Sequence, residues 1–420
     1  YTLNTMLVPS DVMLSMLKLS EFQNPLTGLN FQGTGEPGSP MGAKLIRCSA
    51  MQAGTAIGLD KGYALEEGVR IAKALEALGV DAIDVSSAGY DTFNYWLEPS
   101  SFAPGWRAYL AKEIKSVVSV PVIAANFIRS PEQAEQQLRD GYQDFVASAR
   151  SFICDPHWVK KAEEGRPEEI RRCIGCLNCI RSFMTNAWVG EACECALNMS
   201  MGKEQEYFNM PKDGEGRKVI VIGAGPAGLT AAHTMLWRGF DVTVIEKEEK
   251  PGGQVITAAT CHLKDKLYWC IEDLMENVKA LGGEIKLGCE MSAKEIADMK
   301  PYCVVVATGG TPIRPKSIPG IDLDSVVLAH EIIKGEKKLE NKQVVVVGSG
   351  ITGLEVTEFL NEEGCDVTVI EMAQQIAPGA WFQLVDDEME RIKPYGTKFM
   401  TGTKLVGIEE GKVFVEEQLY

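Results

Sequence analysis

The sequence predicts an α/β protein in which repeated strand and helix units with parallel strands are followed by two copies of one nucleotide-binding unit. Two observations predict this fold. Short apolar runs alternate with longer amphipathic segments from Met41 to about Lys160, which is the pattern of parallel strands joined by helices. Residues 218–247 and 343–372 then align without a gap at an offset of 125 residues. The second half of the chain therefore contains an internal repeat.

The first region contains four predicted strands and three predicted helices. The strands lie at residues 43–47, 82–85, 120–125 and 145–147, and the helices lie at residues 65–78, 106–117 and 132–138. Ser130 is the expected N-cap of the third helix, with Pro131 at its first position and Gln133 placed to reach back in a capping box. Residues 1–40 give no comparable pattern, and we assign them no structure.

Composition and charge exclude several classes of protein. The chain has 420 residues, of which 45% are apolar and 24% charged, and this fits two or three globular domains. Acidic residues outnumber basic ones by 58 to 42, so the net charge is −16 and we expect no nucleic-acid partner. The most apolar stretch, residues 219–237, is interrupted by glycines and a proline. We therefore expect no membrane span and a cytoplasmic location.

Both ends of the chain suggest a fragment. The sequence begins with Tyr1 instead of Met and stops at Tyr420, just after a strand-like run at residues 412–415. We therefore expect both ends to be incomplete.

A glycine motif follows the first apolar run of the first repeat. Residues 219–222 precede Gly223-x-Gly225-x-x-Gly228 and a helix. The first glycine allows a tight turn, the second lets the backbone approach a pyrophosphate, and the third lets the helix pack on the strand. Glu246 ends the next strand, 18 residues after Gly228, where a carboxylate can accept hydrogen bonds from ribose hydroxyls. The alternative interpretation is that the glycines form a tight turn for packing alone. It accounts less well than a dinucleotide site for the preceding strand, the following helix and the acid.

The second repeat has the same parts at Gly348, Gly350, Gly353 and Glu371, so we expect two bound dinucleotides. Because Glu371 would repel a 2′-phosphate, the sequence favours NADH over NADPH. Basic residues elsewhere could compensate for one acidic residue, so NADPH stays open as the alternative.

Four of the twelve cysteines have the spacing of a metal site. Cys173, Cys176 and Cys179 are separated by two residues each, and Cys195 follows after fifteen more. Thiolates at this spacing converge on one centre, which is either zinc or a [4Fe-4S] cluster, and spacing alone does not choose between them. Cys193 stays open as the fourth ligand in place of Cys195.

Residues 217–420 resemble the flavoprotein disulfide-reductase class, in which an FAD domain is interrupted by an NAD(P)H domain. The resemblance rests on the first glycine motif, on Pro251-Gly-Gly-Gln254, and on the stretch that ends in Ala307-Thr308-Gly309. It implies that the first repeat binds FAD, with Gly253, Gln254, Ala307, Thr308 and Gly309 among the contacts, and that the second binds NAD(P)H. No Cys-x-x-Cys lies near Cys261 or Cys270, which implies that the redox-active disulfide of thioredoxin reductases is absent. The last FAD segment of that class is also missing.

Residues 147–156, 164–167 and 172–176 are similar to the end of the FMN barrel in old yellow enzyme relatives that carry an iron–sulfur cluster. This family includes 2,4-dienoyl-CoA reductase, clostridial 2-enoate and bile-acid-pathway reductases, and trimethylamine dehydrogenase. The resemblance implies a partial TIM barrel, a [4Fe-4S] segment and a flavoprotein-reductase module, and it favours the cluster over zinc. The cysteine spacing is closest to trimethylamine dehydrogenase, and Cys195-Ala-Leu-Asn198 resembles its fourth-ligand stretch.

The same resemblance bears on FMN. It implies that Arg150 contacts the FMN phosphate and that Lys44 lies beside the flavin ring. The chain departs from the family pattern at Asn126, Phe127 and Ala149, where glycines usually form the phosphate nest. No counterpart of the family's proton donor occurs in residues 1–40. FMN binding is therefore expected less firmly than FAD binding.

We therefore expect residues 1–165 to form the partial FMN-type barrel, 166–216 the cluster segment and linker, 217–312 the first part of the FAD domain, and 313–420 an incomplete NAD(H) domain.

The expected enzyme passes electrons from NADH through FAD and the cluster to FMN, and reduces the activated C=C bond of a small molecule such as an enoate or dienoyl-CoA. An amine dehydrogenase, or an electron-transfer subunit whose barrel lacks FMN, are the alternatives. The sequence does not decide whether the protein forms homo-oligomers or binds an electron-transfer partner.

Overall fold

The computed structural model describes residues 5–6, 45–49, 64–88 and 92–417. The chain divides into two compact units. The first unit is made of Tyr1–Glu98, Phe102–Cys173 and Cys195–Met201, and the second of Pro99–Ser101, Ile174–Glu194 and Gly202–Tyr420. Within the described ranges, no helix combines the length and apolar character needed to cross a membrane.

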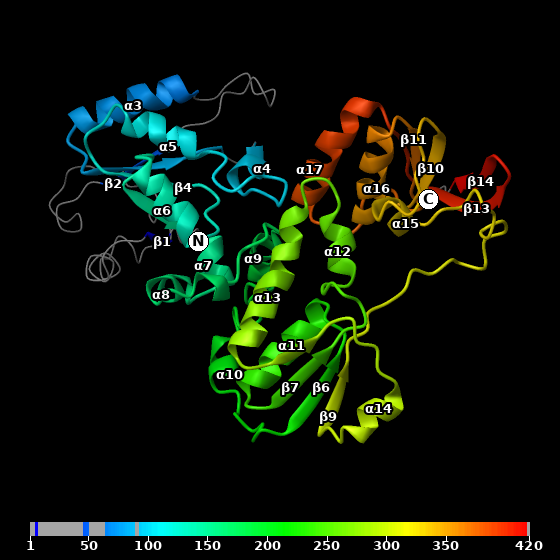
Figure 1. The fold of residues 1–420 in the computed structure, drawn as a ribbon. Helices are drawn as coiled ribbons and strands as arrows, with labels where there is room; N and C mark the ends of the chain where they lie inside the picture. The colour runs from blue at the N-terminus through cyan, green and yellow to red at the C-terminus, as the bar shows by residue number, and fades with distance from the viewer. Residues whose placement is uncertain (1–4, 7–44, 50–63, 89–91, 418–420) are drawn as a thin grey trace. The chain divides into compact units, whose positions relative to one another are not determined.

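The first unit is built on a sheet with the strand order β1-β5-β4-β3-β2. Figure 1 labels β1, β2 and β4 of this sheet. Its strands are β1 (Thr5–Met6), β2 (Leu45–Ser49), β3 (Ala82–Ser86), β4 (Val122–Ala125) and β5 (Phe145–Ser148). Strands β2 to β5 are parallel and adjacent in chain order, and β1 is antiparallel to β5. Neighbouring parallel strands in chain order are the arrangement of a TIM-type barrel.

Helices connect these strands and continue beyond them. They are α3 (Leu65–Ala77), α4 (Phe93–Trp96), α5 (Ala108–Lys115), α6 (Pro131–Arg139), α7 (Arg150–Cys154), α8 (Trp158–Glu163) and the 3-10 helix η3 (Pro167–Glu169). The four predicted strands and three predicted helices of this region are confirmed, with ends that differ by two residues or fewer. Ser130 caps α6 as predicted, but Gln133 accepts its hydrogen bond from the Arg129 amide (2.8 Å) and not from Ser130.

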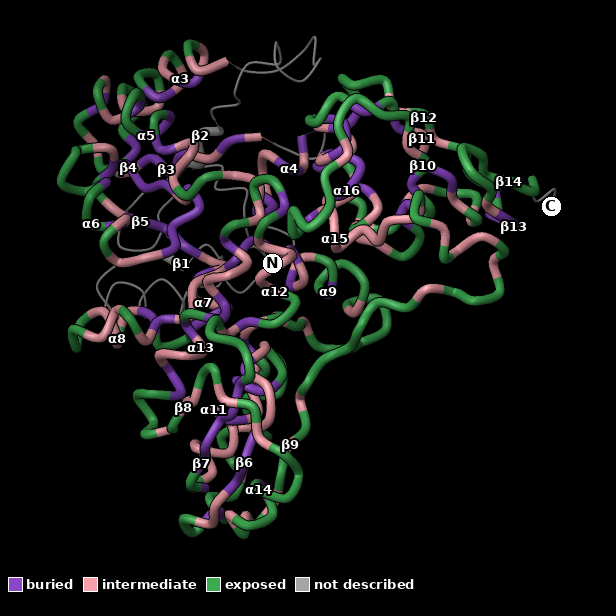
Figure 2. Tube along the Cα trace, turned by 45° about the vertical axis from the view of Figure 1, so that its right-hand side comes forward, coloured by how far each residue is buried: buried purple, intermediate pink, exposed green. Residues whose placement is uncertain are grey.

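The core of the first unit lies where α3 and α5 cover the sheet. Ala72 of α3 and Ile114 of α5 are fully buried against Ile83 of β3 and Val122 of β4, which are also fully buried. Figure 2 shows the corresponding buried segments of these strands. Apolar residues that recur on one face of each helix explain this packing, because burying them against the strands removes their surface from water.

The second unit contains a parallel sheet with the strand order β8-β7-β6-β9. Its strands are β6 (Lys218–Ile222), β7 (Asp241–Ile245), β8 (Glu284–Lys286) and β9 (Cys303–Val306), and its helices are α11 (Pro226–Trp237), α12 (Gln254–Ala259), η5 (Asp265–Tyr268), α13 (Trp269–Ala280) and α14 (Ala293–Asp298). The helices α9 (Asn178–Asn186), η4 (Ala187–Val189) and α10 (Glu204–Phe208) precede this sheet in the chain.

A second parallel sheet follows, with the order β10-β11-β12, and the described chain ends in the hairpin β13-β14. The elements are α15 (Ala329–Ile333), β10 (Gln343–Val347), α16 (Ile351–Glu362), β11 (Asp366–Ile370), α17 (Phe382–Ile392), η6 (Lys393–Tyr395), β12 (Lys398–Met400), β13 (Thr403–Glu409) and β14 (Lys412–Glu417). Val219 pairs with Val242 in the first sheet, and Val344 pairs with Val367 in the second, 125 residues later in both strands. The predicted repeat is thus present in the backbone register.

Candidate functional site

The three predicted FAD-contact stretches lie side by side in the second unit. Gly223 has φ +104°, and a Cβ atom built on it would lie 2.4 Å from the Ala307 carbonyl oxygen. A Cβ atom on Gly253 would lie 3.8 Å from the Cα of Gly225. Gln254 Nε2 donates a hydrogen bond of 2.8 Å to the Gly310 carbonyl oxygen. The first glycine loop therefore contacts both the stretch before α12 and the stretch after β9, where Thr308 and Gly309 are exposed.

The other two glycines of the first loop differ in their surroundings. A Cβ atom on Gly228 would lie 1.9 Å from the Gly223 carbonyl oxygen, so only glycine lets α11 pack this closely on the loop. A Cβ atom on Gly225 would meet nothing nearer than the Gly252 carbonyl oxygen, at 4.0 Å. The backbone at Gly225 is therefore open at the start of α11, where amide groups can bind a pyrophosphate. This geometry fits a dinucleotide such as FAD.

Glu246 is held at the end of β7 beside the same loop. Its Oε2 accepts a hydrogen bond of 2.8 Å from the Ala224 amide, and its Oε1 accepts one of 3.0 Å from the Glu248 amide. A carboxylate oxygen has two lone pairs, so each oxygen can still accept a hydrogen bond from a ribose hydroxyl.

The second glycine loop repeats this geometry. Cβ atoms on Gly348 and Gly350 would meet nothing within 4 Å, whereas one on Gly353 would lie 2.0 Å from the Gly348 carbonyl oxygen. Glu371 accepts hydrogen bonds of 2.8 Å from the Ser349 amide and from the Ser349 hydroxyl. This loop fits a second dinucleotide.

The Glu371 carboxylate is held in its charged form. Its burial alone would raise its pKa, but hydrogen bonds from the amides of Ala373 and Ser349 outweigh burial, and the pKa lies below its usual value. The Ala373 amide donates to Glu371 Oε1 at 2.8 Å. A negative charge is therefore fixed beside the second loop.

Two of the predicted cluster ligands, Cys173 and Cys195, belong to the first unit. The neighbouring Cys154 thiol is the main cause that lowers the pKa of Cys195 to about 6. The same neighbour, followed by burial, raises the pKa of Cys154 well above its usual value, and Cys173 adds to this effect. A lowered pKa favours the thiolate form of Cys195, which is the form that ligates metals.

The other two predicted ligands, Cys176 and Cys179, belong to the second unit together with Cys193. Two left-handed residues shape this segment: Gly175 has φ +71° and Leu177 has φ +58°. A Cβ atom on Gly175 would lie 3.0 Å from the Ser100 amide nitrogen, so glycine is required there.

Cys193 is engaged by protein groups. Its thiol donates a hydrogen bond to the Cys179 carbonyl oxygen (3.1 Å) and lies 3.4 Å from the Ser182 hydroxyl. A cysteine that donates its S–H in this way is less suited to be the fourth ligand than the Cys195 thiolate. No disulfide involves the five clustered cysteines, and their thiol chemistry fits a metal or an iron–sulfur cluster.

The loop after β4 carries the residues that replace glycines of the expected phosphate nest. Asn126 is buried and accepts a hydrogen bond of 2.9 Å from Gln137 Nε2. Phe127 is also buried and adopts φ +58°, a left-handed conformation that side chains other than glycine rarely take. The backbone thus keeps a glycine-like turn at Phe127 although the side chain is large.

Two arginines lie against the Phe127 ring. The guanidinium carbon of Arg129 is 3.4 Å from the ring centroid and that of Arg150 is 5.2 Å away. Arg129 is only 3% exposed, and its Nη1 donates to the Ile128 carbonyl oxygen at 3.0 Å. Its Nε and Nη2 atoms have no hydrogen-bond partner among the described residues. Burial is the main cause that lowers the pKa of Arg129 to about 10, so it stays charged at neutral pH. A buried cation with two free donor groups after β4, near the start of α7, fits an anionic group such as the FMN phosphate.

Arg150 is instead paired with a buried carboxylate. It forms an ion pair with Glu98, and its Nη1 also donates to the Glu98 carbonyl oxygen at 2.6 Å. Arg107 Nη2 lies 3.1 Å from Glu98 Oε1 on the other side. Burial of Glu98 raises its pKa, but the charges of Arg107 and Arg150 outweigh burial, so its pKa is lowered. Glu98 therefore bridges two arginines at this end of the sheet.

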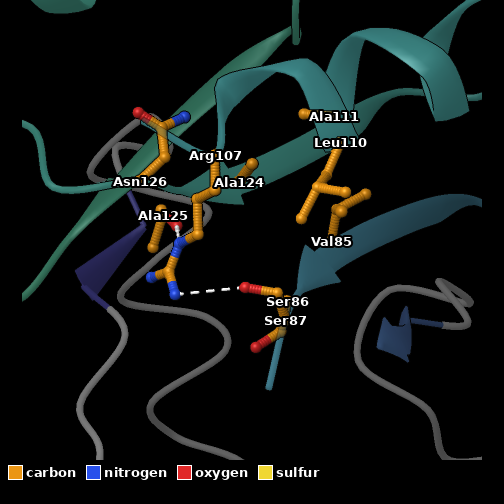
Figure 3. A pocket seen from close by; sticks show the side chains of 9 residues that line it. All are labelled: Val85, Ser86, Ser87, Arg107, Leu110, Ala111, Ala124, Ala125 and Asn126. Carbon is orange, nitrogen blue, oxygen red and sulfur yellow. Dashed lines mark hydrogen bonds between the residues drawn. The ribbon is translucent and has the colours of Figure 1, made fainter. Parts of the chain in front are cut away.

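Arg107 also lines a small pocket at the carboxyl ends of β3 and β4 (Figure 3). Its Nε donates to the Ala125 carbonyl oxygen at 3.0 Å, and its Nη1 donates to the Ser87 hydroxyl at 3.3 Å. This end of the strands is where barrel enzymes place their active sites.

Sequence reasoning missed three residues of this region: Glu98, Arg129 and Cys154. A single charged residue or cysteine is not part of a recognisable sequence motif. These three residues are distinguished by their burial and by their contacts with residues distant in the chain. The predicted residue Lys44 lies outside the described residues.

Comparison with known proteins identifies the family. Residues 49–169 match the NADH:flavin oxidoreductase / NADH oxidase family, and residues 217–418 match the pyridine nucleotide-disulphide oxidoreductase family. The two matches occur in the order that the sequence predicts. The chain belongs to the old yellow enzyme-like family of iron–sulfur flavoenzymes. This membership confirms the predicted fold, a partial TIM barrel followed by a Rossmann-like module for two dinucleotides.

Individual members of the flavoenzyme family are similar over most of the chain. The NADH oxidase of Thermoanaerobacter brockii is 39% identical over 323 residues, which are 76% of this chain and 49% of that protein. The bilirubin reductase of Mediterraneibacter gnavus is 34% identical over 361 residues, which are 84% of this chain and 55% of that protein. A structure of 2-naphthoyl-CoA reductase with 2-naphthoyl-CoA superposes with a TM-score of 0.78 at 28% identity, covering 89% of this chain and 55% of that one. The chain thus spans about half the length of these relatives.

Proposed function

We propose that the protein carrying this chain is an NADH-dependent flavin and iron–sulfur oxidoreductase that reduces an activated C=C bond. The bound flavins would supply hydride transfer, at FAD from NADH and at FMN to the substrate, and a [4Fe-4S] cluster would supply single-electron transfer between them. Relatives named cinnamate reductase and 2-naphthoyl-CoA reductase support a conjugated acid or its CoA ester as the substrate class.

The second glycine loop is the observation that carries this proposal. Gly348 and Gly350 leave the backbone open, and Glu371 presents a fixed negative charge beside them. A carboxylate in this position binds the two ribose hydroxyls of NADH and disfavours a 2′-phosphate. This geometry supports a site through which a nicotinamide donor supplies electrons, which a dehydrogenase of amines does not need.

We propose that the first glycine loop holds FAD. Amides at the start of α11 bind the pyrophosphate near Gly225, and Glu246 binds the adenosine ribose. Gly253, Gln254, Ala307, Thr308 and Gly309 are proposed to complete the site. Gly253, Ala307 and Thr308 lie next to the glycine loop, and Gln254 bonds the Gly310 carbonyl oxygen.

For the cluster we propose the ligands Cys173, Cys176, Cys179 and Cys195. The lowered pKa of Cys195 supports its choice as the fourth ligand, and the hydrogen bond from Cys193 to the Cys179 carbonyl oxygen argues against Cys193.

For FMN we propose that Arg129 contacts the phosphate directly. Within the described part of the chain its buried Nε and Nη2 groups have no partner, so an anion that accepts their hydrogen bonds removes a desolvation penalty of about 1–3 kcal/mol or more for these charged groups. Arg150 lies near Arg129 and contributes positive charge, although its guanidinium is already paired with Glu98.

Two measurements test the function. Anaerobically purified protein should release FMN and FAD in equal amounts, and it should oxidise NADH when cinnamate or an enoyl-CoA is added. Release of FAD alone, with no substrate-dependent NADH oxidation, would favour an electron-transfer subunit, which the non-glycine residues Asn126 and Phe127 also suggest.

An amine dehydrogenase is the other alternative, because dimethylglycine/sarcosine dehydrogenase of Chromohalobacter salexigens is 33% identical over 328 residues. Reduction of the bound flavins by a methylated amine and not by NADH would favour that function.

A further inference from the structure

A buried serine hydroxyl connects the acid of the second glycine loop to the chain that follows that acid. Ser349 is 0% exposed. Its hydroxyl donates a hydrogen bond of 2.8 Å to Glu371 Oε2 and accepts one of 3.0 Å from the Ala377 amide. Ser349 is neither a glycine nor the acid of the dinucleotide motif, and the proposed function gives its side chain no role.

The direction of these hydrogen bonds follows from the protons available. An amide can only donate, and a hydroxyl has one proton. Because the Ala377 amide donates to the Ser349 hydroxyl oxygen, the hydroxyl proton is free to point at Glu371, whose carboxylate accepts. The Ser349 amide donates to the same Oε2 atom at 2.8 Å, and the Ala373 amide donates to Oε1 at 2.8 Å. Donors on both oxygens therefore hold the carboxylate in one orientation.

The first repeat makes the corresponding connection through its backbone. Gly252 lies 125 residues before Ala377, and its amide donates to the Ala224 carbonyl oxygen at 2.9 Å. Ala224 has no hydroxyl and donates to Glu246 through its amide. The second loop thus uses one side chain, that of Ser349, both to hold its acid and to attach the following chain.

We propose that Ser349 is a positioning residue for Glu371, and that its hydroxyl fixes the carboxylate where it binds the ribose of NADH and repels the 2′-phosphate of NADPH. This inference rests on the proposed function, because it requires a nicotinamide dinucleotide at the second loop. It adds a residue that acts on the nucleotide only through the carboxylate.

The physical reason is the freedom of the Glu371 side chain. Glu371 is only partly buried, so without the serine hydroxyl its carboxylate can turn toward water. Ordering the side chain again on binding costs conformational entropy, which weakens the binding of NADH. A carboxylate that has turned away also lies farther from a 2′-phosphate, and the repulsion between two charges falls with distance. Loss of the hydroxyl should therefore weaken the binding of NADH more than that of NADPH.

The test compares variants of the full-length flavoprotein. Ser349→Ala removes the hydroxyl, Glu371→Gln removes the charge, and a double variant combines the two changes. Thr357→Val is the control, because Thr357 is also 0% exposed but its hydroxyl bonds the Gly353 carbonyl oxygen at 2.7 Å. Anaerobic stopped-flow reduction of the flavin, at several concentrations of NADH and of NADPH, gives a dissociation constant and a limiting rate constant for each nucleotide. Thermal unfolding checks that each variant is folded.

We expect Ser349→Ala to raise the dissociation constant of NADH about tenfold, which is the scale of one hydrogen bond to a charged group. The dissociation constant of NADPH should change by about twofold or less, so the preference for NADH narrows. The limiting rate constant should stay the same, because the adenosine ribose takes no part in hydride transfer. Thr357→Val should leave both dissociation constants unchanged.

The double variant shows whether Ser349 acts through Glu371. Once Glu371→Gln has removed the charge, Ser349→Ala should have little further effect on the binding of NADH, because two residues that act as one unit are not additive. An equal further loss would mean that the serine acts on the loop as a whole, and it would overturn the inference.

Two other results would overturn it as well. One is an unchanged dissociation constant of NADH in a folded Ser349→Ala variant. The other is an equal weakening by Ser349→Ala and Thr357→Val, which would indicate a general loss of packing. If NADH does not reduce the flavin of the unmodified protein, the proposed function itself fails before any variant is compared.

Discussion

Ser349 donates two hydrogen bonds to Glu371, one from its amide and one from its hydroxyl, each 2.8 Å long. In the first repeat the corresponding residues are Ala224 and Glu246, and only the amide bond is present. The acid of the second loop is therefore held by one more hydrogen bond than the acid of the first.

This geometry predicts a preference for NADH. NADH should reduce the flavin faster than NADPH, by about 1–3 kcal/mol of activation free energy, because Glu371 accepts ribose hydroxyls and repels a 2′-phosphate. Glu371→Arg should narrow or invert this preference. Anaerobic stopped-flow reduction with each nucleotide measures it, and Glu410→Arg, at an exposed turn residue, controls for the change of charge. Equal rates in the unmodified protein would contradict the assignment.

Two glycines of the first loop should respond differently to alanine. At Gly225 a methyl group meets no atom closer than 4.0 Å, so Gly225→Ala should fold normally but bind FAD more weakly, because the methyl group occupies the path of the pyrophosphate. At Gly228 the methyl group would lie 1.9 Å from a carbonyl oxygen, so Gly228→Ala should lower the thermal midpoint of unfolding even without FAD. Flavin content and thermal unfolding of the apoprotein measure both effects. Normal FAD binding by Gly225→Ala would mean that the loop does not bind the pyrophosphate.

The cysteines predict an iron–sulfur cluster with a defined fourth ligand. Anaerobically purified protein should contain about four iron and four sulfide ions per chain, with a broad visible absorption that dithionite bleaches. Cys195→Ser should lose iron, whereas Cys193→Ser should keep it, because the Cys193 thiol donates to a backbone oxygen. Metal analysis checks both variants. One zinc ion and no iron would exclude the cluster, and the reverse result for the two variants would move the fourth ligand to Cys193.

Arg129 should decide whether FMN is retained. Arg129→Ala should lose FMN and keep FAD, and Arg129→Lys should retain part of the FMN because it keeps a charge but cannot form the bidentate contact. Arg150→Ala should also weaken FMN binding, since it removes positive charge and leaves Glu98 with one arginine fewer. Chromatography of flavins released by denaturation gives the FMN to FAD ratio. An unchanged ratio in Arg129→Ala would place the phosphate elsewhere.

Glu98 predicts how the stability of the first unit depends on pH. Its folded pKa is lowered, so its contribution is present above its unfolded pKa of about 4.3 and is lost as the pH falls through the folded value. At pH 7, Glu98→Gln should destabilise the protein by about 3–5 kcal/mol, because Arg107 and Arg150 lose their buried counter-charge. The difference between variant and unmodified protein should shrink in acid.

Chemical denaturation at pH 7 and at lower pH measures this difference. Glu135→Gln is the matched control, because the Glu135–Arg139 pair is exposed and should contribute at most about 0.5 kcal/mol. Equal stability of Glu98→Gln and Glu135→Gln would show that the buried ion pairs contribute little.

The fold could be predicted because its signals are local. The strands and helices of the first unit, from α3 onward, follow from apolar periodicity and from the Ser130 cap, and the repeat follows from aligned glycines and acids. The predicted site residues are those that a motif marks, in the two glycine loops and the cysteine series, and their binding roles stay predictions.

The remaining site residues depend on tertiary contacts. Cys154 is 41 residues from Cys195, and Glu98 is 52 residues from Arg150. Arg129 has no local feature that distinguishes it from a solvated arginine. What marks it is burial, with no partner for Nε and Nη2 among the described residues. Spacing rules cannot detect such residues, because their role is created by the folding of distant segments.

The shared register of β6 with β7 and of β10 with β11 has an evolutionary consequence. The two copies are offset by the same number of residues in both strands, in the intervening helix and at the terminal acid. Duplication of one ancestral segment produces this pattern. The two copies kept one backbone although their side chains differ at 17 of 30 aligned positions, among them Ala224 and Ser349. The glycines and the terminal acid are common to both copies, so this scaffold tolerates extensive side-chain change around a constant loop.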